Sequence, residues 1–507
     1  MSRKRRTIGA VMLTMALAIA ASACDANSLH PATERSELRI GMVGSSIDEV
    51  QPYAQHGSIS NRAIYDQLYE GLTSLGNDGA VVFVLAESME PNDSLDVWTI
   101  HLRDGVQTHA GEDFTAEDAA ASIAWMVDKD NAWAFASQLD FIDPARIRVV
   151  DDLTLELGLN RPYGPVPEAF SMSRILMRSV KGDATFEAPA GTGPFKLESL
   201  TPGIQAKMTR FDDYWGDTSL LDSLVFSFFQ EPQAVTNAIR GDQIDVAQGI
   251  PFPEIPSLES MQGLATVVSD TASTPFLAVR VDVEPTSDPL VRQALRLVVD
   301  RERVVANAFG GFASVGNDYV ARNSACSPPD VPQRAQDIEE AKRLLAEAGQ
   351  ESLELEIVTD GAVSGMAEMA MLFAEDAAQA GIEISVRKLD VTAFLNQWLE
   401  WPFFTGYTSS PYFVTATGHF LPGGSENSTG WDDPEYNSVA EALFATVDPV
   451  EQCEYISRLQ TIEYERGGYI MPIYGQDVTV YNERVSGLQP DLYARTAYRL
   501  AGVSVAD

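Results

Sequence analysis

One stretch, residues 98–127, constrains the fold of this chain more than any other part of the sequence. Apolar and polar residues alternate over 98–102, which is the pattern of a strand with one buried face. The Asp104-Gly105 pair predicts a turn, because glycine adopts positive φ without a steric penalty. Thr115 and Asp118 have the spacing of a helix capping box, and apolar residues follow at helical intervals. The stretch therefore predicts a strand, a turn, a loop and a helix, a combination typical of α/β domains.

The length and net charge of the chain limit the number of domains that we expect and the partners that it can bind. A single hydrophobic core stops growing near ~250–300 residues, so 507 residues predict two or three domains. The 35 basic and 73 acidic residues give a net charge of -38. Such an acidic surface repels nucleic acid and anionic lipid, so a nucleic-acid partner is excluded.

The first residues have the composition of an export signal. Residues 1–23 begin with a basic cluster and continue with an apolar run shorter than the ~20 residues of a membrane span. Small residues then precede Cys24. This pattern predicts cleavage before Cys24, lipidation of that cysteine, and a lipidated tether over residues 24–36. An ordinary signal peptide with an incidental cysteine is the alternative, and the choice between the general secretion and twin-arginine export routes stays open.

Several further segments carry recognisable patterns. Residues 191–195 read GTGPF, and they predict a tight turn that leads into a strand. A phosphate-binding P-loop is excluded, because Pro194 lacks an amide and no Gly-Lys-Ser/Thr follows. Residues 146–159 predict a hairpin, and residues 353–386 predict two parallel strands joined by a helix.

These motifs, in their order, resemble one protein family. The segments that carry the resemblance are LRDGV and GEDFTAED at 102–118, YEGL at 69–72, GTGPF at 191–195, RFDDYWG at 210–216, and DPLVRQAL at 288–295. This order is similar to that of the family 5 extracellular solute-binding proteins, the peptide and nickel receptors of bacterial ABC importers. The matches run from residue 38 to about residue 487.

The resemblance implies the fold class and the domain organisation. The expected fold is α/β, a two-lobed periplasmic-binding-protein fold of type II, in the large peptide-binding class, with an extra subdomain inserted in lobe one. The expected segments are a signal peptide at 1–23, a tether at 24–36, lobe one at 37–72, 190–272 and 474–507, the inserted subdomain at 73–189, and lobe two at 273–473.

The resemblance also implies a function. The chain is expected to be a lipid-anchored receptor on the outer face of the cell membrane, which captures a peptide or similar polar solute between its lobes and delivers it to ABC permease subunits. A monomer suits a cleft that opens and closes. A binding lipoprotein with a sensing role, for a non-peptide ligand such as a glycoside, a blocked peptide or a metal chelate, is the alternative.

The expected ligand site lies between the lobes. In peptide receptors of this family an aspartate of lobe two pairs with the peptide ammonium, but residues 408–410 here are Thr, Ser and Ser. An unpaired buried ammonium costs several kcal/mol, so we expect a ligand without the usual ammonium clamp. The predicted ligand-binding residues are Ser45, Ser46, Trp401, Tyr407, Thr408, Ser409, Ser410, Tyr412, His419 and Tyr474. The aromatic segment 394–436 is interpreted either as a binding surface or as a secondary core beneath a long loop.

Catalytic and metal chemistry finds no support in the sequence. The chain lacks G-x-S-x-G, H-E-x-x-H and Walker motifs, and its five histidines have no metal-ligand spacing. We therefore expect no enzymatic activity, no cofactor and no metal. Cys326 and Cys453 are either a disulfide pair or two separate thiols.

Overall fold

The computed structural model describes residues 36–53, 58–179, 191–321, 326, 328, 330–350, 352–360 and 363–506. The predicted signal peptide and Cys24 lie outside these residues. Three sheets of four or more strands organise the described chain, and two of them form the centres of two lobes.

The sheet of lobe one has eight strands drawn from distant parts of the sequence. Parallel pairing of β1 with β10 and β11 lies at its middle, and antiparallel strands flank it. In spatial order the strands are β12 (Leu264–Asp270), β19 (Ile473–Asn482), β11 (Val246–Ala247), β1 (Glu37–Val43), β10 (Ser223–Phe229), β9 (Gln205–Arg210) and β8 (Phe195–Thr201), with β14 (Ala313–Val315) paired to β19. Its helices are α1 (Ile59–Leu68), α4 (Pro232–Arg240) and α5 (Ile255–Glu259).

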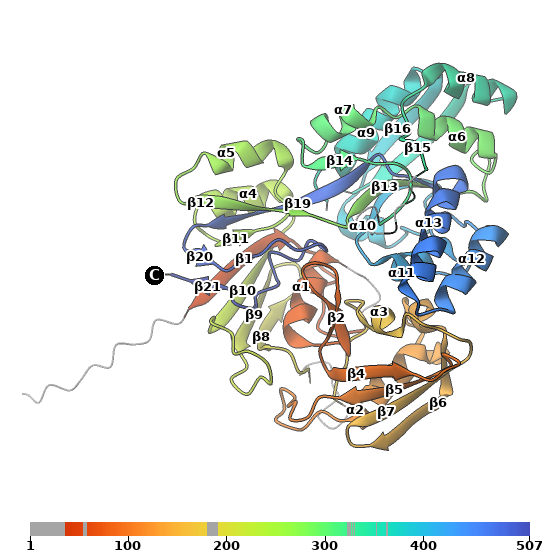
Figure 1. Cartoon of the computed structure of the whole chain (residues 1–507). Helices are drawn as coiled ribbons and strands as arrows, with labels where there is room; N and C mark the ends of the chain where they lie inside the picture. Colours follow the sequence, from red (N-terminus) through yellow and green to blue (C-terminus); the bar gives the residue numbers. More distant parts are fainter. Residues whose placement is uncertain are drawn as a thin grey trace, which may run out of the picture. The chain divides into compact units, whose positions relative to one another are not determined.

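The sheet of lobe two has five strands. The predicted strand–helix–strand unit over 353–386 is confirmed, because β15 and β16 pair in parallel and α9 packs against both. In spatial order the strands are β16 (Ile382–Lys388), β15 (Leu353–Thr359), β17 (Phe403–Thr408), β13 (Thr274–Val279) and β18 (Tyr469–Ile470). The helices of this lobe are α6 (Pro289–Leu297), α7 (Arg301–Asn307), α8 (Ile338–Glu347), α9 (Met366–Ala378), α10 (Val391–Leu395), α11 (Tyr412–Thr415), α12 (Pro434–Phe444) and α13 (Pro449–Arg466), labelled in Figure 1.

The third sheet and its helix contain residues 98–127. Its strands are β4 (Ala86–Pro91), β5 (Val97–Leu102), β7 (Thr154–Leu159) and β6 (Ile142–Asp151), with α2 (Ala116–Val127) packed on it. The predicted capping box is present, since the Asp118 carboxylate accepts the Thr115 backbone N–H at 2.8 Å. The predicted hairpin is β6–β7. The short helix α3 (Val166–Phe170) and the small pairs β2 (Thr73–Leu75) with β3 (Val81–Phe83) and β20 (Val485–Ser486) with β21 (Ser504–Val505) complete the fold.

The chain passes between the sheets of the two lobes at two neighbouring points, and β14, which lies between lobe-two strands in sequence, also pairs with β19 of the lobe-one sheet. The first follows β12 at 271–273, and the second precedes β19 at 471–472. Hydrogen bonds join them: the Thr271 hydroxyl donates to the Gly475 carbonyl at 2.7 Å, and the Gly475 N–H donates to the Ser273 carbonyl at 2.8 Å. The expected segments stay predictions, and β14, within the segment expected for lobe two, pairs with the lobe-one sheet.

A disulfide joins Cys326 to Cys453 across 127 residues of sequence. Cys453 belongs to α13, so the bond ties the loop that contains Cys326 to this long helix of lobe two. Of the two possibilities that the sequence left open for these cysteines, the structure contains the bonded pair.

The aromatic segment 394–436 is largely core. Phe404, Tyr412, Phe420, Trp431 and Tyr436 are each at most 5% exposed and belong to one buried cluster. The secondary-core interpretation therefore describes most of this segment, because its loops fold back on α12 and α13 and bury the rings between them.

Candidate functional site

A large cavity is lined by residues of both lobes. Its volume is about 1000 Å³, at the upper end of the range for small-molecule sites. Lobe one contributes the loop after β1, helix α1, residues 171–174 and the C-terminal residues 495–502. Lobe two contributes β17 with residues 409–411, helix α10 and the turn that contains His419.

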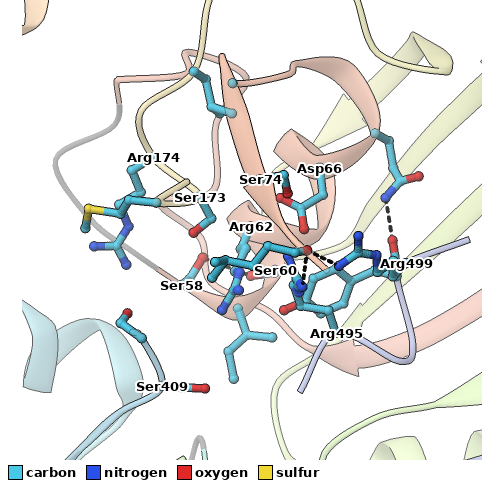
Figure 2. A pocket seen from close by; sticks show the side chains of 18 of the residues that line it. Ser58, Ser60, Arg62, Asp66, Ser74, Ser173, Arg174, Ser409, Arg495 and Arg499 are labelled. Carbon is cyan, nitrogen blue, oxygen red and sulfur yellow. Dashed lines mark hydrogen bonds between the residues drawn. The ribbon is translucent and has the colours of Figure 1, made fainter. Parts of the chain in front are cut away.

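Helix α1 forms the charged part of the lobe-one wall. Ser58 caps the helix, because its hydroxyl accepts the Asn61 backbone N–H at 3.0 Å and donates to Asp48 at 2.7 Å. Ala63, Ile64 and Leu68 are fully buried beneath the helix. The opposite face, with Arg62 and Asp66 four residues apart, therefore faces the cavity (Figure 2).

Two guanidinium groups of the lobe-one wall lie close enough to affect each other. Burial lowers the pKa of Arg174, and the positive charge of Arg62 adds to this decrease. Arg174 lies over the ring of Phe135 at 4.1 Å and 4.0 Å from the Glu426 carboxylate. Burial opposes the charged form of Arg62, but the nearby charges of Tyr498 and Asp66 outweigh it, so the pKa of Arg62 is raised. Its buried Nε atom lacks a hydrogen-bond partner among the described residues.

The C-terminal segment contributes a second group of charged side chains to the same wall. Arg495 pairs with Asp491 at 3.0 Å and donates to the Leu75 carbonyl at 2.9 Å, and Arg499 lies 3.4 Å from Asp491. Burial raises the pKa of Asp66, and the nearby positive charges oppose this rise. These contacts fix the arginines of the C-terminal segment against the β2 region.

The lobe-two wall is built mainly from hydroxyl groups and aromatic rings. Strand β17 and the residues after it present Thr405, Tyr407, Thr408, Ser409 and Ser410 to the cavity. The Thr408 hydroxyl lies 3.2 Å from the Thr415 hydroxyl, whereas Ser409 Oγ is buried without a hydrogen-bond partner in the described part of the chain. The rings of Phe394, Trp398 and Phe404 provide the apolar part of this wall.

His419 lies deep in the lobe-two wall and contacts acidic and aromatic neighbours. Burial lowers the pKa of its imidazole, which keeps it neutral near pH 7. Its Nε2 lies 3.5 Å from Glu426, and its ring packs edge-on to Phe276 and Tyr469. No group of three or more His, Cys, Asp or Glu residues within the described ranges is arranged to hold a metal ion.

The structure brings together six of the ten predicted ligand-binding residues at the cavity wall. These are Ser45, Tyr407, Thr408, Ser409, Ser410 and His419. Ser45 also lies within hydrogen-bonding distance of Thr392 of lobe two, at 3.4 Å between the hydroxyl oxygens. Tyr407 is 38% exposed, so its ring is available to a solute in the cavity.

The other four predicted residues do not line the cavity. Tyr412 is in the core, where its hydroxyl donates to Glu463 at 2.6 Å, and the Tyr474 hydroxyl donates to the Tyr319 carbonyl at 3.0 Å. Trp401 packs beneath the guanidinium of Arg387 at 4.9 Å, and Ser46 is exposed away from the wall. Aromatic content and loop position alone could not distinguish residues of the cavity wall from residues that pack elsewhere in the protein.

The arginines of the cavity were not among the residues predicted from the sequence. Arg62 and Asp66 lie opposite the apolar stripe of α1, a position usually interpreted as a solvated helix face. The available signal was the location of this helix directly after the loop with Ser45, which the family resemblance already assigned to the cleft.

Comparisons with known proteins agree with this fold. Residues 80–427 match the model of the bacterial extracellular solute-binding proteins, family 5. The glutathione-binding protein GsiB of Salmonella paratyphi A is 24% identical over 479 residues, which cover 89% of this chain and 91% of that protein. Two solved structures each superpose with a TM-score of 0.84 over 93% of this chain and 99% of theirs: the binding protein AgaA of A. tumefaciens R10 with agropinic acid, at 21% identity, and DppA of Helicobacter pylori with the peptide STSA, at 18%.

Within the described residues, no helix combines the length and the hydropathy that a membrane span requires.

Proposed function

The chain belongs to the bacterial extracellular solute-binding proteins of family 5, and from this premise we propose that it is the receptor subunit of an ABC importer. In this role it captures a peptide or a similar polar solute between its two lobes and delivers it to permease subunits in the membrane. Lipidated Cys24 anchors it to the outer face of that membrane, and it acts as a monomer.

The observation that carries the proposal is the cavity of about 1000 Å³ lined by both lobes. This volume suits a solute of the size of a short peptide. Hydroxyl groups and arginines supply many hydrogen-bond donors, and three aromatic side chains on one wall supply an apolar contact surface. A wall of this kind recognises a polar solute by contacts alone and requires no covalent chemistry.

The ligands of the relatives support a peptide-like solute. They are glutathione for GsiB, agropinic acid for AgaA and a tetrapeptide for DppA. Each of these ligands is a small polar molecule. They do not identify the ligand of this chain, because all three proteins are at most 24% identical to it.

Closure of the lobes is the expected mechanism. A solute that contacts both walls binds the closed form more tightly than the open form, so it shifts the population toward closure. The Ser45–Thr392 contact at 3.4 Å is one direct link between the lobes beside the cavity. Permease subunits would then recognise the closed form.

The experiment that tests the function begins with the protein purified under native conditions and without its signal peptide. The protein is denatured, the released small molecules are identified by mass spectrometry, and each is then returned to ligand-free protein in a calorimetric titration. We expect a peptide or peptide-like solute that binds with a one-to-one stoichiometry. A cellular uptake assay with and without the gene then separates import from sensing, because a sensing protein would bind the solute without changing its uptake.

The lipid anchor requires a separate measurement, since Cys24 lies outside the described residues. We expect Cys24→Ser to release the protein from the membrane fraction without changing its affinity for the solute. An unchanged distribution between the membrane and soluble fractions would contradict anchoring through Cys24.

A further inference from the structure

The cavity continues beyond the space between the lobes and follows the C-terminal end of α1. Its lining there comes from the β2–β3 pair, the loop at 214–220 and the C-terminal residues 495–502, all of which lie outside the lobe-two sheet and its helices. We call this part of the cavity the α1 groove. The larger apolar side chains that line it are Leu75, Val82, Phe83, Trp215, Leu220 and Leu500.

Hydrogen bonds hold these three segments around the end of α1. The indole N–H of Trp215 donates to the Glu70 carboxylate at 2.8 Å, and the side-chain amide of Gln67 donates to the Tyr498 carbonyl at 2.7 Å. The carbonyl of Leu75 in β2 accepts from an arginine of the C-terminal segment at 2.9 Å. Contacts between distant parts of the sequence therefore position the walls of the groove.

The charged side chains of the groove are already paired with other residues. Arg495 and Arg499 lie 3.0 and 3.4 Å from the Asp491 carboxylate, and the Tyr214 hydroxyl donates to Glu70 at 2.7 Å. A charged group of a solute would have to displace these partners, and each displaced partner would lose its compensating contact. An uncharged group leaves the pairs in place, so the groove favours an uncharged occupant.

The outer end of the groove is apolar and open to solvent. Val82 is 43% exposed and Leu220 is 59% exposed, and Phe83 beside Val82 is exposed as well. Among the described residues, four large apolar or aromatic side chains are both exposed and part of the cavity lining, and only Tyr407 lies elsewhere. Removal of apolar surface from water is favourable in proportion to its area, so an apolar occupant gains most at this end.

We propose that the α1 groove binds a hydrocarbon chain carried by the solute, while the polar part of the same molecule lies between the lobes. This inference rests on the receptor function proposed above and makes its solute amphiphilic. The continuity of the groove with the space between the lobes identifies the occupant, because residues of both line a single cavity. Figure 2 shows the junction of the two parts, where Asp66, Ser74 and Arg499 lie beside Arg62.

The groove differs from the rest of the cavity in its relation to closure. Its walls contain no residue of the lobe-two sheet or helices, so a rotation of lobe two leaves them in place. A chain in the groove therefore adds affinity in the open and the closed forms alike, whereas the polar part of the solute favours the closed form. The open outer end lets a long chain leave the cavity when the lobes are closed.

The test uses tripeptides of two alanines and one lysine, in which the lysine side-chain nitrogen carries an acetyl, a hexanoyl or a decanoyl group. The lysine occupies each position of the tripeptide in turn, so that only the chain length differs within a set. Calorimetric titration measures binding to the ligand-free wild-type protein, Val82→Asp, Leu220→Asp and the control Val268→Asp. Val268 is a matched control, because it is a valine on a lobe-one strand that is 39% exposed and does not line the cavity.

For at least one lysine position, we expect the wild-type protein and Val268→Asp to bind the decanoyl peptide at least about tenfold more tightly than the acetyl peptide. Val82→Asp and Leu220→Asp should lose most of this gain, because the chain would have to displace water from a carboxylate. Their affinity for the acetyl peptide should equal that of the wild type. The substituted side chains are exposed, so the unfolding temperatures of all the variants should match the wild type.

The outcomes separate this proposal from the receptor function. Equal affinity for all chain lengths, or a gain that persists in both Val82→Asp and Leu220→Asp, overturns the groove proposal and leaves the receptor function in place. If the wild-type protein binds none of the peptides, the peptide specificity of the receptor is overturned.

The groove is then tested by itself with N-phenylnaphthylamine, a neutral dye whose fluorescence rises in apolar surroundings. Dye binding that Val82→Asp and Leu220→Asp lose and Val268→Asp retains supports the groove as an apolar site. The absence of dye binding, or equal binding in all the variants, overturns the groove proposal as well.

Discussion

The two walls of the cavity recognise different properties of a solute. The lobe-one wall presents Arg62 and Asp66 of α1, Arg495 and Arg499 of the C-terminal segment, and Arg174 after α3. The lobe-two wall presents a row of hydroxyls from β17 and three aromatic rings. The lobe-one wall is thus the more basic one, whereas the lobe-two wall adds Asp360 and Glu426 to its hydroxyls and rings.

The walls also differ in what supports them. Behind the lobe-two wall, Asp318 is fully buried between Arg301 and Arg334 at 2.8 and 2.7 Å, and a disulfide ties α13 to the loop of Cys326. The lobe-one wall depends on close backbone packing behind α1, where Gly191 and Gly193 approach the carbonyls of the last helical turn. Ion pairs therefore support both walls, but only the lobe-two wall is backed by a disulfide, and the lobe-one wall additionally requires glycine next to the end of α1.

The largest expected effect comes from removal of the disulfide. Cys453→Ala should lower the free energy of unfolding by about 2–4 kcal/mol, because the bond closes a long loop. Affinity for the solute should stay the same, since neither cysteine lines the cavity. Thermal unfolding with and without a reducing agent measures this, and the reductant should reproduce the variant in the wild type. An unchanged unfolding temperature would remove the proposed difference in support between the lobes.

A buried acid in each lobe makes stability depend on pH. Burial raises the pKa of Glu463 from 4.5 to about 7, against the hydrogen bonds that Tyr412 and Tyr436 donate to it. The folded protein therefore holds this proton more tightly than the unfolded chain. The resulting stability is fully present below about pH 4.5 and is lost as the pH rises through about 7, by at most about 3 kcal/mol.

The matched pair of variants is Glu463→Gln in lobe two and Glu70→Gln in lobe one. Burial also raises the pKa of Glu70 to about 7, and its carboxylate accepts from Tyr214 at 2.7 Å and Trp215 at 2.8 Å. Each variant should flatten the fall of the unfolding temperature between pH 5 and 8. A wild-type protein whose unfolding temperature rises over this interval would contradict the predicted sign.

Two glycine substitutions compare the backbone support of the walls. A Cβ at position 191 would lie 1.8 Å from the Leu68 carbonyl oxygen, which belongs to the end of α1 and cannot move alone. A Cβ at position 406 would lie 2.5 Å from the ring of Phe276, a side chain that can rotate. We expect Gly191→Ala to destabilise the protein by about 1–3 kcal/mol and Gly406→Ala by less. Denaturant unfolding measures the loss of stability in both variants, and a larger loss for Gly406→Ala would contradict the expected order.

The smallest expected effects are those of two substitutions in lobe two, one of a cavity residue and one of a core residue. Ser409→Ala removes a cavity hydroxyl and should weaken solute binding by about 0.5–1.5 kcal/mol with no change in the unfolding temperature. Tyr412→Phe removes the hydrogen bond to Glu463 and should change the unfolding temperature with no change in affinity. Calorimetric titration and thermal unfolding of the two variants test this. Reduced affinity in Tyr412→Phe would restore the sequence-based assignment of Tyr412 to the ligand site.

The sequence predicted those elements of the fold that depend on residues close together in the chain. The capping box at Thr115, the hairpin over 146–159 and the parallel unit over 353–386 depend on spacings of a few residues, which the chain itself contains. The sheet of lobe one could not be predicted from such spacings, because its neighbouring strands β1, β11 and β19 are far apart in sequence. The family resemblance alone supplied that organisation.

The site was only partly predictable for a related reason. The position of the expected clamp pointed to Thr408, Ser409 and Ser410, which line the cavity, and their role in ligand binding stays a prediction. Arg62 was missed, because an arginine opposite a helical apolar stripe has the same pattern whether it faces water or a cavity. Tyr412 was wrongly favoured, because its buried acceptor Glu463 is 51 residues away in the sequence.

The two neighbouring chain crossings at 271–273 and 471–472 determine how the lobes can move. A single linker would let one lobe rotate in any direction relative to the other. Two segments bonded to each other through Thr271, Ser273 and Gly475 restrict this rotation, as a two-segment hinge does. We therefore expect closure to be a rotation about these paired segments, which would bring the same residues of the two walls face to face each time.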